Sequence, residues 1–230
     1  MAENNDLQFI DCLPVNDLVV LEGESLHLEM AFFSVLPSGE LKIRVKKGAS
    51  LEAALADFSI GSSKLNVEIA LEEGATSEFH LAALGKGDSV KTYIPNAIHL
   101  EPHSESLISS YGIASEKSNI SFLGTSSIEK NAKNSATRQE AKVILFDKES
   151  KGAASPILKI ADNDVKASHG ASVGRLNDDH LFYLESRGLS EEDAKRLITL
   201  GYLKPIASYF ADESLRQRIE SEIEGGIYRV

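Results

Sequence analysis

Val45-Lys-Lys-Gly48-Ala-Ser50 recurs 26 residues later as Leu71-Glu-Glu-Gly74-Ala-Thr76, and a similar apolar, charged and turn-forming arrangement follows at Leu100-Glu-Pro-His103-Ser104. A repeat of ~20 to 50 residues is typical of a stacked fold, in which each coil covers the apolar face of its neighbour. Regularly spaced turns are equally typical of a β-sandwich. The repeat alone therefore predicts an all-β fold and leaves these two architectures open.

Around this repeat, apolar and polar residues alternate with period two up to about Gly174. Leu41, Ile43 and Val45 alternate with charged residues, and the segment 65–71 continues the same pattern. This period places one set of side chains on a buried face and indicates strands. We expect roughly nine to twelve short strands and no long helix before Gly174.

After Gly174 the apolar spacing becomes helical. Asn177 or Asp178 can cap a first helix that ends near Gly188, Ser190 can cap a second, and Pro205 suits the first turn of a third. A last helix is indicated by residues spaced at i, i+4 and i+8: Leu215, Ile219 and Ile223. Its Arg216 and Glu220 form a possible surface pair. We expect a β domain over residues 1–174 and a helical domain over 175–230, whose amphipathic helices need a surface to cover them.

The composition limits the classes of function. The 230 residues include 24 Lys and Arg against 35 Asp and Glu, for a net charge of −11. This excess argues against a nucleic-acid groove, where basic side chains replace phosphate counterions. No apolar run approaches the ~20 residues of a membrane-spanning helix, and the polar, acidic start does not resemble a signal peptide. One cysteine, Cys12, excludes a multi-cysteine metal site within one chain. We expect a cytoplasmic protein.

Few residues indicate catalysis. Phosphate-binding loops, dinucleotide-binding turns, nucleophile elbows and zinc-protease helices are all absent from the sequence. His169 stands apart from the other five histidines because small residues flank it where the strands give way to helices. Its imidazole could ligate a metal or move a proton, or it could hold the domain junction by a hydrogen bond. Asp162 and Asp164 could form a carboxylate pair, although acids so spaced in a turn are more often caps.

The segment 157–195 carries a specific resemblance. It contains Ser168-His-Gly-Ala-Ser-Val-Gly174 and then Leu181-Phe-Tyr-Leu-Glu-Ser-Arg-Gly188. This combination resembles the C-terminal signature of the SufB/SufD family, the scaffold proteins of the SUF iron–sulfur cluster assembly system. Residues 122–139 resemble the preceding coils more loosely, and residues 1 to about 110 agree only in general character.

The resemblance implies a mainly β protein, a right-handed parallel β-helix (β-solenoid) followed by a small C-terminal α-helical domain. It also implies that two scaffold subunits pair through their β-helices and that each helical end docks on SufC, an ABC-type ATPase. The apolar stripes of the helices would then be buried on the ATPase. The expected contact residues are Leu181, Phe182, Tyr183, Leu184, Arg187 and Gly188.

Two departures make the chain SufD-like. SufB-type members have His-Glu where this chain has His169-Gly170, and they supply a cluster-building cysteine that is absent from the β-helix here. The usual N-terminal helical region is also not recognisable, which suggests a shortened member. Ala167 stands where the family often has cysteine. In a chain paired with itself, Cys12 from each copy would be available to contribute.

By this resemblance, His169 matches the histidine that the family associates with iron or a nascent cluster at the paired interface. The iron–sulfur cluster or iron would be transient and shared with a SufB-type chain or a second copy, and a sulfur donor or partner would supply the thiolates, since one imidazole cannot hold a cluster. We expect no enzyme activity and no nucleic-acid or membrane partner. Two alternatives remain: a β-helix enzyme (acyltransferase or carbohydrate-active) using His169 or Asp162 and Asp164, and a purely structural tether.

Overall fold

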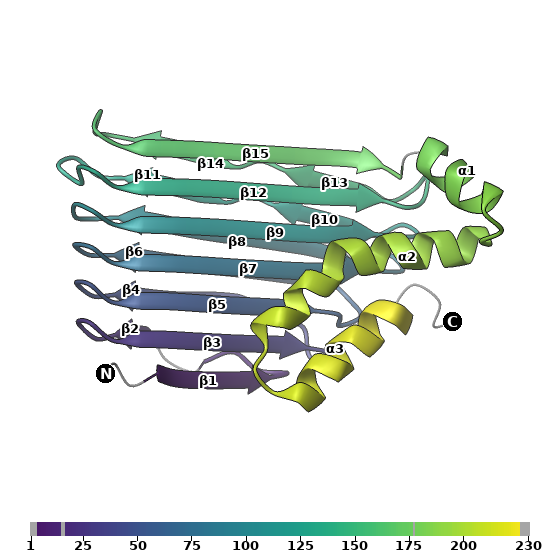
Figure 1. Ribbon diagram of the computed structural model, residues 1–230, viewed down its shortest axis with the longest axis horizontal. Coiled ribbons are helices and arrows are strands. Elements are labelled where there is room, and N and C mark those ends of the chain that lie inside the picture. The colour runs from purple at the N-terminus through teal and green to yellow at the C-terminus, as the bar shows by residue number, and fades with distance from the viewer. Residues whose placement is uncertain (1–3, 15–16, 177, 226–230) are drawn as a thin grey trace.

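The computed structural model describes residues 4–14, 17–176 and 178–225, and it forms a β-solenoid with a C-terminal helical segment (Figure 1). Its strands form two sheets, and every strand pairing is parallel. Parallel neighbours far apart in sequence are the signature of stacked coils, so the solenoid and not the sandwich is the correct choice between the two architectures left open by the repeat.

Within the described residues, one sheet has seven strands in a simple order: β1 (Asn4–Ile10), β3 (Ser25–Phe32), β5 (Ser50–Asp57), β7 (Thr76–Gly85), β9 (Glu105–Ala114), β12 (Ala136–Leu145) and β15 (Lys166–Arg175). The other sheet, also counted over the described residues, has eight strands: β2 (Leu18–Val20), β4 (Gly39–Val45), β6 (Ser63–Leu71), β8 (Val90–His99), β10 (Asn119–Phe122), β11 (Thr125–Ile128), β13 (Lys151–Ala154) and β14 (Ile157–Ile160). The first sheet therefore runs from the first coil at β1 to the last coil at β15.

One turn of each coil carries the repeat seen in the sequence. Gly23, Gly48, Gly74, His103 and Asn134 occupy equivalent positions, all in the left-handed region with φ of 71°, 63°, 64°, 62° and 57°. Each donates its N–H to the carbonyl just before the equivalent position of the next coil. Glycine and asparagine are favoured there because other side chains are strained at positive φ. Consecutive members are 25, 26, 29 and 31 residues apart, so the coils lengthen toward β15.

The interior between the two sheets is apolar over the first coils. The alternating residues of β4 and β6 point inward, as the period-two pattern predicts, and Leu41, Ile43 and Leu65 are almost fully buried. Further along the stack the interior becomes more polar. Inward positions of β9 and β12 include buried Ser106 and Thr137, which are hydrogen-bonded to each other at 2.8 Å. The core therefore changes character toward the last coils.

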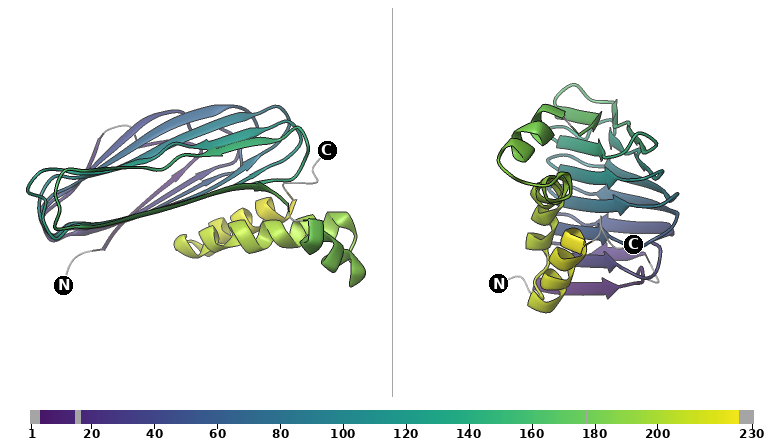
Figure 2. Two further views of the ribbon diagram at one scale, coloured as in Figure 1. Left: turned by 90° about the horizontal axis from the view of Figure 1, so that it is seen from above. Right: turned by 90° about the vertical axis from the view of Figure 1, so that its right-hand side faces the viewer.

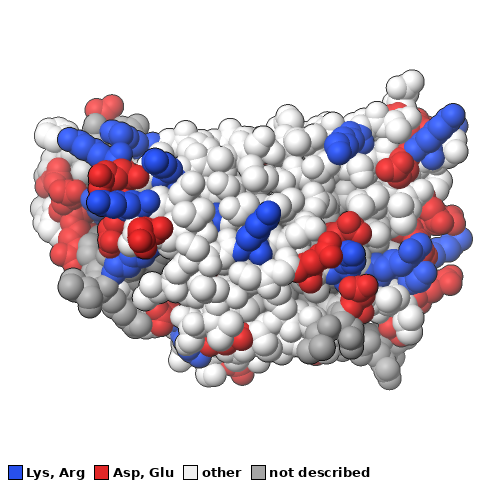
Figure 3. Space-filling model, turned by 180° about the vertical axis from the view of Figure 1, so that it is seen from behind, with Lys and Arg blue, Asp and Glu red and all other residues white. Residues whose placement is uncertain are grey.

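The outer face of the eight-stranded sheet is seen from behind in Figure 3. Charged side chains of both signs gather toward the two ends of this face, and few lie in its middle. Lys and Arg there are interspersed with Asp and Glu and do not form a continuous basic stripe on this face.

The helical segment lies against the outer face of the seven-stranded sheet (Figure 2). Its elements are α1 (Asp178–Ser186), α2 (Glu191–Leu203), the 3-10 helix η1 (Lys204–Tyr209) and α3 (Glu213–Gly225). The predicted cap at Ser190 is confirmed, because its Oγ accepts from the Asp193 N–H at 3.0 Å. Arg216, however, binds the Phe210 carbonyl and Glu213, and Glu220 pairs with Lys204, so the predicted Arg216–Glu220 pair does not form.

The apolar stripes of α2, η1 and α3 are largely buried within the chain, although Leu197 of α2 is 50% exposed. Leu203, Phe210 and Ile219 pack in one cluster with residues of the seven-stranded sheet such as Ala54 and Ile113. The expectation that these stripes would be buried on an ATPase is therefore wrong for all three elements. Their spacing correctly predicted an apolar face on each helix. It could not show which surface covers that face, because the alanines of the sheet have no sequence pattern that distinguishes them from other strand residues. No helix in the described part of the chain has the length and apolar character to span a membrane.

Candidate functional site

The last coil of the solenoid is open. Every residue of β15 is exposed on both faces, and β14 is largely exposed as well. Among the described strands β15 pairs only with β12, so its other edge has no strand beside it. Side chains that lie inward in earlier coils are uncovered here, including Val173 and Ile160, each 40% exposed. An exposed strand edge next to uncovered apolar groups is a surface suited to adding another strand.

His169 lies in this open coil. In the strand register it continues the row Phe79, Ile108, Gln139, whose members are buried inside the solenoid. Because alternate residues of a strand share a face, His169 stands on the side of β15 that faces the open interior. Below it, the Gln139 Nε2 lies 2.5 Å from the Ser126 Oγ and 3.4 Å from the Ile157 carbonyl oxygen. The imidazole is thus exposed at the end of the stack, one strand beyond the hydrogen-bonded Gln139 in the register.

Asp162 and Asp164 are turn residues. The Asp162 carboxylate accepts the N–H of Asp164 at 3.1 Å and that of Asn131 at 3.2 Å. These hydrogen bonds, first that from Asp164, lower the pKa of Asp162 below its usual value. The Asp164 carbonyl accepts the N–H of Asn134 at 2.6 Å. Asp162 thus acts as a cap that joins the last two coils, which is how acids with this spacing usually act.

Cys12 and His169 are not brought together within one chain. Cys12 is exposed just after β1, in the first coil, whereas His169 lies on β15 at the opposite end of the sheet (Figure 1). Over residues 4–14, 17–176 and 178–225, no three His, Cys, Asp or Glu residues form a group that could hold a metal ion. Within the described chain, His169 would therefore need ligands from outside.

The predicted contact residues lie in and after α1, beside the last coil (Figure 1). Phe182 and Tyr183 are 71% and 56% exposed, and Leu181 and Leu184 are half-buried. The guanidinium of Arg187 lies 5.2 Å from the centre of the Tyr183 ring. Gly188 has φ +93°, the left-handed conformation predicted for the end of this helix. The two aromatic residues of this helix are therefore uncovered in the chain.

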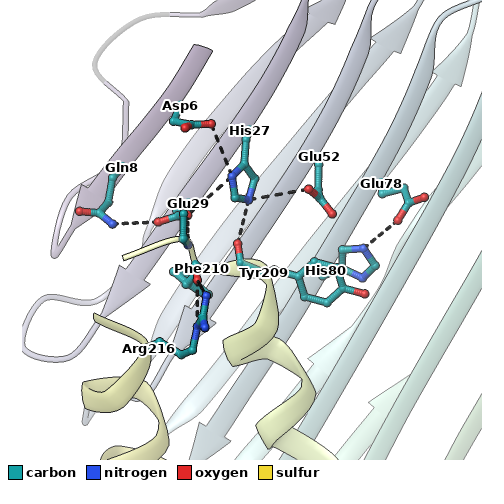
Figure 4. A network of polar contacts seen from close by, with 11 residues as sticks. Asp6, Gln8, His27, Glu29, Glu52, Glu78, His80, Tyr209, Phe210 and Arg216 are labelled. Atoms are coloured by element: carbon teal, nitrogen blue, oxygen red, sulfur yellow. Dashed lines mark hydrogen bonds and ion pairs between the residues drawn. The ribbon is translucent and has the colours of Figure 1, made fainter. Parts of the chain in front are cut away.

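Sequence reasoning missed the contacts that fasten the helical segment to the sheet (Figure 4). The His27 Nε2 lies 2.8 Å from the Tyr209 carbonyl oxygen, and the Glu29 carboxylate accepts the N–H of Ala211. His80 stacks on the Tyr209 ring with centroids 3.8 Å apart. These partners are 182 residues apart in the first two pairs, so no local pattern could have revealed them.

Two further buried networks were also missed. His99 has no exposed surface, and its nitrogens lie 2.7 Å from the Ser104 Oγ and 2.8 Å from the Ser106 Oγ. Elsewhere in the interior, the Lys91 Nζ lies 3.0 Å from the Asp57 carboxylate, and burial lowers the pKa of Lys91. Neither network reaches the exposed coil, so both belong to the interior of the solenoid.

The parallel coils, the exposed final strand and the exposed aromatic residues of α1 define a β-solenoid whose last coil is open within the described residues. Residues 34–202 match the family model for the SufBD core domain, described as SUF system FeS cluster assembly. The chain therefore belongs to the SufBD family.

Three curated relatives illustrate the similarity. The chain is 29% identical over 212 residues to the iron-sulfur cluster assembly protein SufD of Bacillus subtilis, which covers 89% of this chain and 48% of the relative. It is 29% identical to a SufBD family protein of Mycobacterium bovis, covering 81% of this chain and 22% of that protein. A SufBD family protein of Staphylococcus aureus is 30% identical to this chain, and the match covers 74% of this chain and 38% of that protein. The chain thus spans about half or less of the length of these relatives.

Proposed function

We propose that this chain is a non-catalytic scaffold subunit of SUF iron–sulfur cluster assembly, which pairs with another scaffold chain through the open coil at β15. The observation that carries the proposal is the unpaired, fully exposed β15 in a chain of the SufBD family. Another chain that added its own strand there would satisfy the free backbone groups and cover Val173 and Ile160. The partner is a SufB-type chain or a second copy.

His169 is the residue of this interface that we assign to iron or a nascent cluster. Its imidazole stands on the open side of the last coil, where a partner's side chains would face it. A neutral imidazole is a borderline ligand, whereas a cluster also needs thiolates. Since Cys12 lies at the far end of the stack, those thiolates come from the partner or from a sulfur donor. The iron or cluster is then cargo shared between two chains.

The second contact that we propose is with an ABC-type ATPase of the SufC kind. The exposed α1, with Phe182 and Tyr183 on its surface, is the docking element, and it lies beside the same open coil. In this arrangement residues 1–174 act as the scaffold domain and residues 175–230 as the docking domain. Pairing through β15 would bring two such helices, and two ATPases, to one region of the complex.

The iron role is tested by replacing the imidazole in the assembled complex. The chain is purified with its scaffold partner and the ATPase, and iron bound per complex is measured for the wild type and His169→Ala. We expect the variant to bind iron at least about tenfold more weakly, the range found when groups around a metal are removed. The composition of the complex should stay the same.

The control is His103→Asn, which removes another exposed imidazole from a turn where asparagine tolerates the positive φ. It should load iron as the wild type does. Equal iron in the wild type and His169→Ala would contradict the metal role, and failure to form any complex would contradict the scaffold role.

A further inference from the structure

A cavity of about 320 Å³ lies between the outer face of the seven-stranded sheet and the helical segment. The residues that matter for its chemistry come from both sides: His80, Ser109 and Tyr111 from the sheet, and Gly201, Tyr202 and Tyr209 from α2 and η1. This volume is at the lower end of the range for small-molecule sites, which runs from about 300 to 1,000 Å³. The cavity is far smaller than a docking surface for a protein and suits a small molecule.

Gly201 is the second observation that points to a ligand. It lies inside α2, and the helical backbone continues past it to Lys204, so no left-handed turn requires glycine there. A Cβ built on Gly201 would meet nothing within 4 Å, so no packing contact of the described chain requires glycine either. Glycine is nonetheless the poorest helix former after proline. Its presence keeps open a space that any larger side chain would begin to fill.

The walls of the cavity are aromatic. Tyr111, Tyr202 and Tyr209 contribute three phenol rings, and His80 stacks on Tyr209 with its ring 3.8 Å away (Figure 4). Aromatic faces prefer to stack against another flat ring. A planar ring system therefore fits these walls better than a branched aliphatic group does.

The polar groups around the rings are mainly hydroxyls, which can donate or accept hydrogen bonds, and the Tyr111 hydroxyl already donates to the Glu140 carboxylate at 3.3 Å. Within the described chain, no hydrogen bond uses the hydroxyl groups of Tyr202, Tyr209 or Ser109. Burial raises the pKa of Tyr209 and of Tyr111, so both phenols stay protonated at neutral pH. The hydroxyls of Tyr202, Tyr209 and Ser109 can therefore donate to ring nitrogens and carbonyl oxygens of a ligand, which are acceptors.

We propose that this cavity is a binding site for a planar nitrogen heteroaromatic ring system of about the size of a purine. The ring lies among the three tyrosines beside Gly201, and its acceptor atoms receive hydrogen bonds from the hydroxyls of Tyr202, Tyr209 and Ser109. This site is separate from the open coil, since none of its residues belongs to β15.

Adenosine is the probe, and its binding to the purified full chain is followed by saturation-transfer NMR and calorimetry. We expect saturable binding by the wild type and at least tenfold weaker binding by Gly201→Leu, whose side chain would occupy the cavity. Gln217→Leu is the matched control, because it adds the same side chain at an exposed position of α3 outside the cavity and should bind as the wild type does. Indole, which has no acceptor nitrogen in its ring, should bind much more weakly than adenosine.

A measurement of Tm separates loss of the site from loss of the fold. Gly201→Ala should raise Tm by about 2 °C, because alanine favours the helix and meets no neighbour. A lower Tm would show that the chain itself needs the glycine and would overturn the proposal. No saturable adenosine binding by the wild type, equal binding by Gly201→Leu, or equal affinity for indole would also overturn it.

Discussion

At the scale of single residues, the buried imidazole of His99 shows how polar groups are held inside this solenoid. Its two nitrogens contact the hydroxyls of Ser104 and Ser106, and these contact Ser135 and Thr137 of the next coil. Burial lowers the pKa of His99 from 6.5 to about 4, which means that the folded protein holds this ring neutral. The neutral ring can accept a hydrogen bond from one hydroxyl and donate a hydrogen bond to the other.

This pKa predicts how stability depends on pH. Between about pH 6.5 and 4 the unfolded chain binds a proton that the folded chain does not, so the free energy of unfolding falls as the pH falls. For one fully buried group with this shift, the expected loss is about 3 kcal/mol. Urea unfolding of the wild type and His99→Gln at several pH values measures it.

The variant should be less stable at pH 7, but its stability should fall less between pH 6.5 and 4. Carboxylates titrate in both proteins, so their effect cancels in the difference between the two curves. Two parallel curves would show that His99 does not titrate in this way.

The residues of the candidate site were only partly predictable from the sequence. The position of His169 between strands and helices correctly suggested an uncrowded imidazole, because small flanking residues leave it exposed. That it stands above Gln139, in the row of buried residues, depends on a register set by pairing with β12, thirty residues away in sequence. The clamp of His27 and Glu29 on the segment 209–211 depends on contacts between the two ends of the chain and leaves no local signal.

At the scale of elements, the local sequence pattern predicted the type of each helix or strand well. It predicted the position of each element in the fold less well. The alternation in β4 and β6 and the cap at Ser190 are local, and both are confirmed. The surface that covers α2 and α3 is not local. Small residues such as Ala54 and Ala82 make the outer face of the sheet flat and apolar, and the helices pack there. Among the helices in the described residues, α1 is the one whose large apolar side chains lack such a cover.

This difference predicts which helix would bind the ATPase that we propose as a partner. The double variant Phe182→Ser and Tyr183→Ser should keep the Tm of the wild type within a few degrees, because both side chains are more than half exposed. Affinity for the ATPase should fall at least about tenfold, the effect of losing one or two buried aromatic anchors. Calorimetric titration of the ATPase measures it.

Val19→Ser serves as the control, since this side chain is 51% exposed at the opposite end of the stack. It should leave the affinity unchanged. If the double variant binds the ATPase as tightly as the wild type, α1 is not the docking element.

At the scale of the whole molecule, the helical segment runs from the last coil back to the first. α1 lies beside β15, η1 contacts β5 and β7, and the turn before α3 is fixed to β3 through His27 and Glu29 (Figure 4). The two ends of the stack are thus joined by a strap as well as by the strands. We expect the solenoid and helices to unfold together, because they share one apolar cluster.

Pairing through the open coil is also a property of the whole molecule, and it is tested at Val173. In Val173→Lys a charge would be placed on the uncovered side of β15, where the partner is expected to bury it, and burying an unpaired charge is costly. We expect the paired form to be lost in light scattering while the separate chain stays folded. The control Val35→Lys, at a residue 49% exposed in a loop of the first coils, should pair normally. Unchanged pairing by Val173→Lys would place the interface elsewhere.

The equivalent turn positions from Gly23 to Asn134 are 25, 26, 29 and 31 residues apart, and this spacing has a consequence for symmetry. Because the coils lengthen along the stack, the first and last coils of the solenoid differ in circumference. If the last coil of one copy met the first coil of the next, two coils of unequal size would face each other at every junction. Such head-to-tail contacts are the ones that grow into open filaments. Two last coils placed face to face are equal in size. A twofold axis relates the two copies, so this arrangement is complete as a dimer.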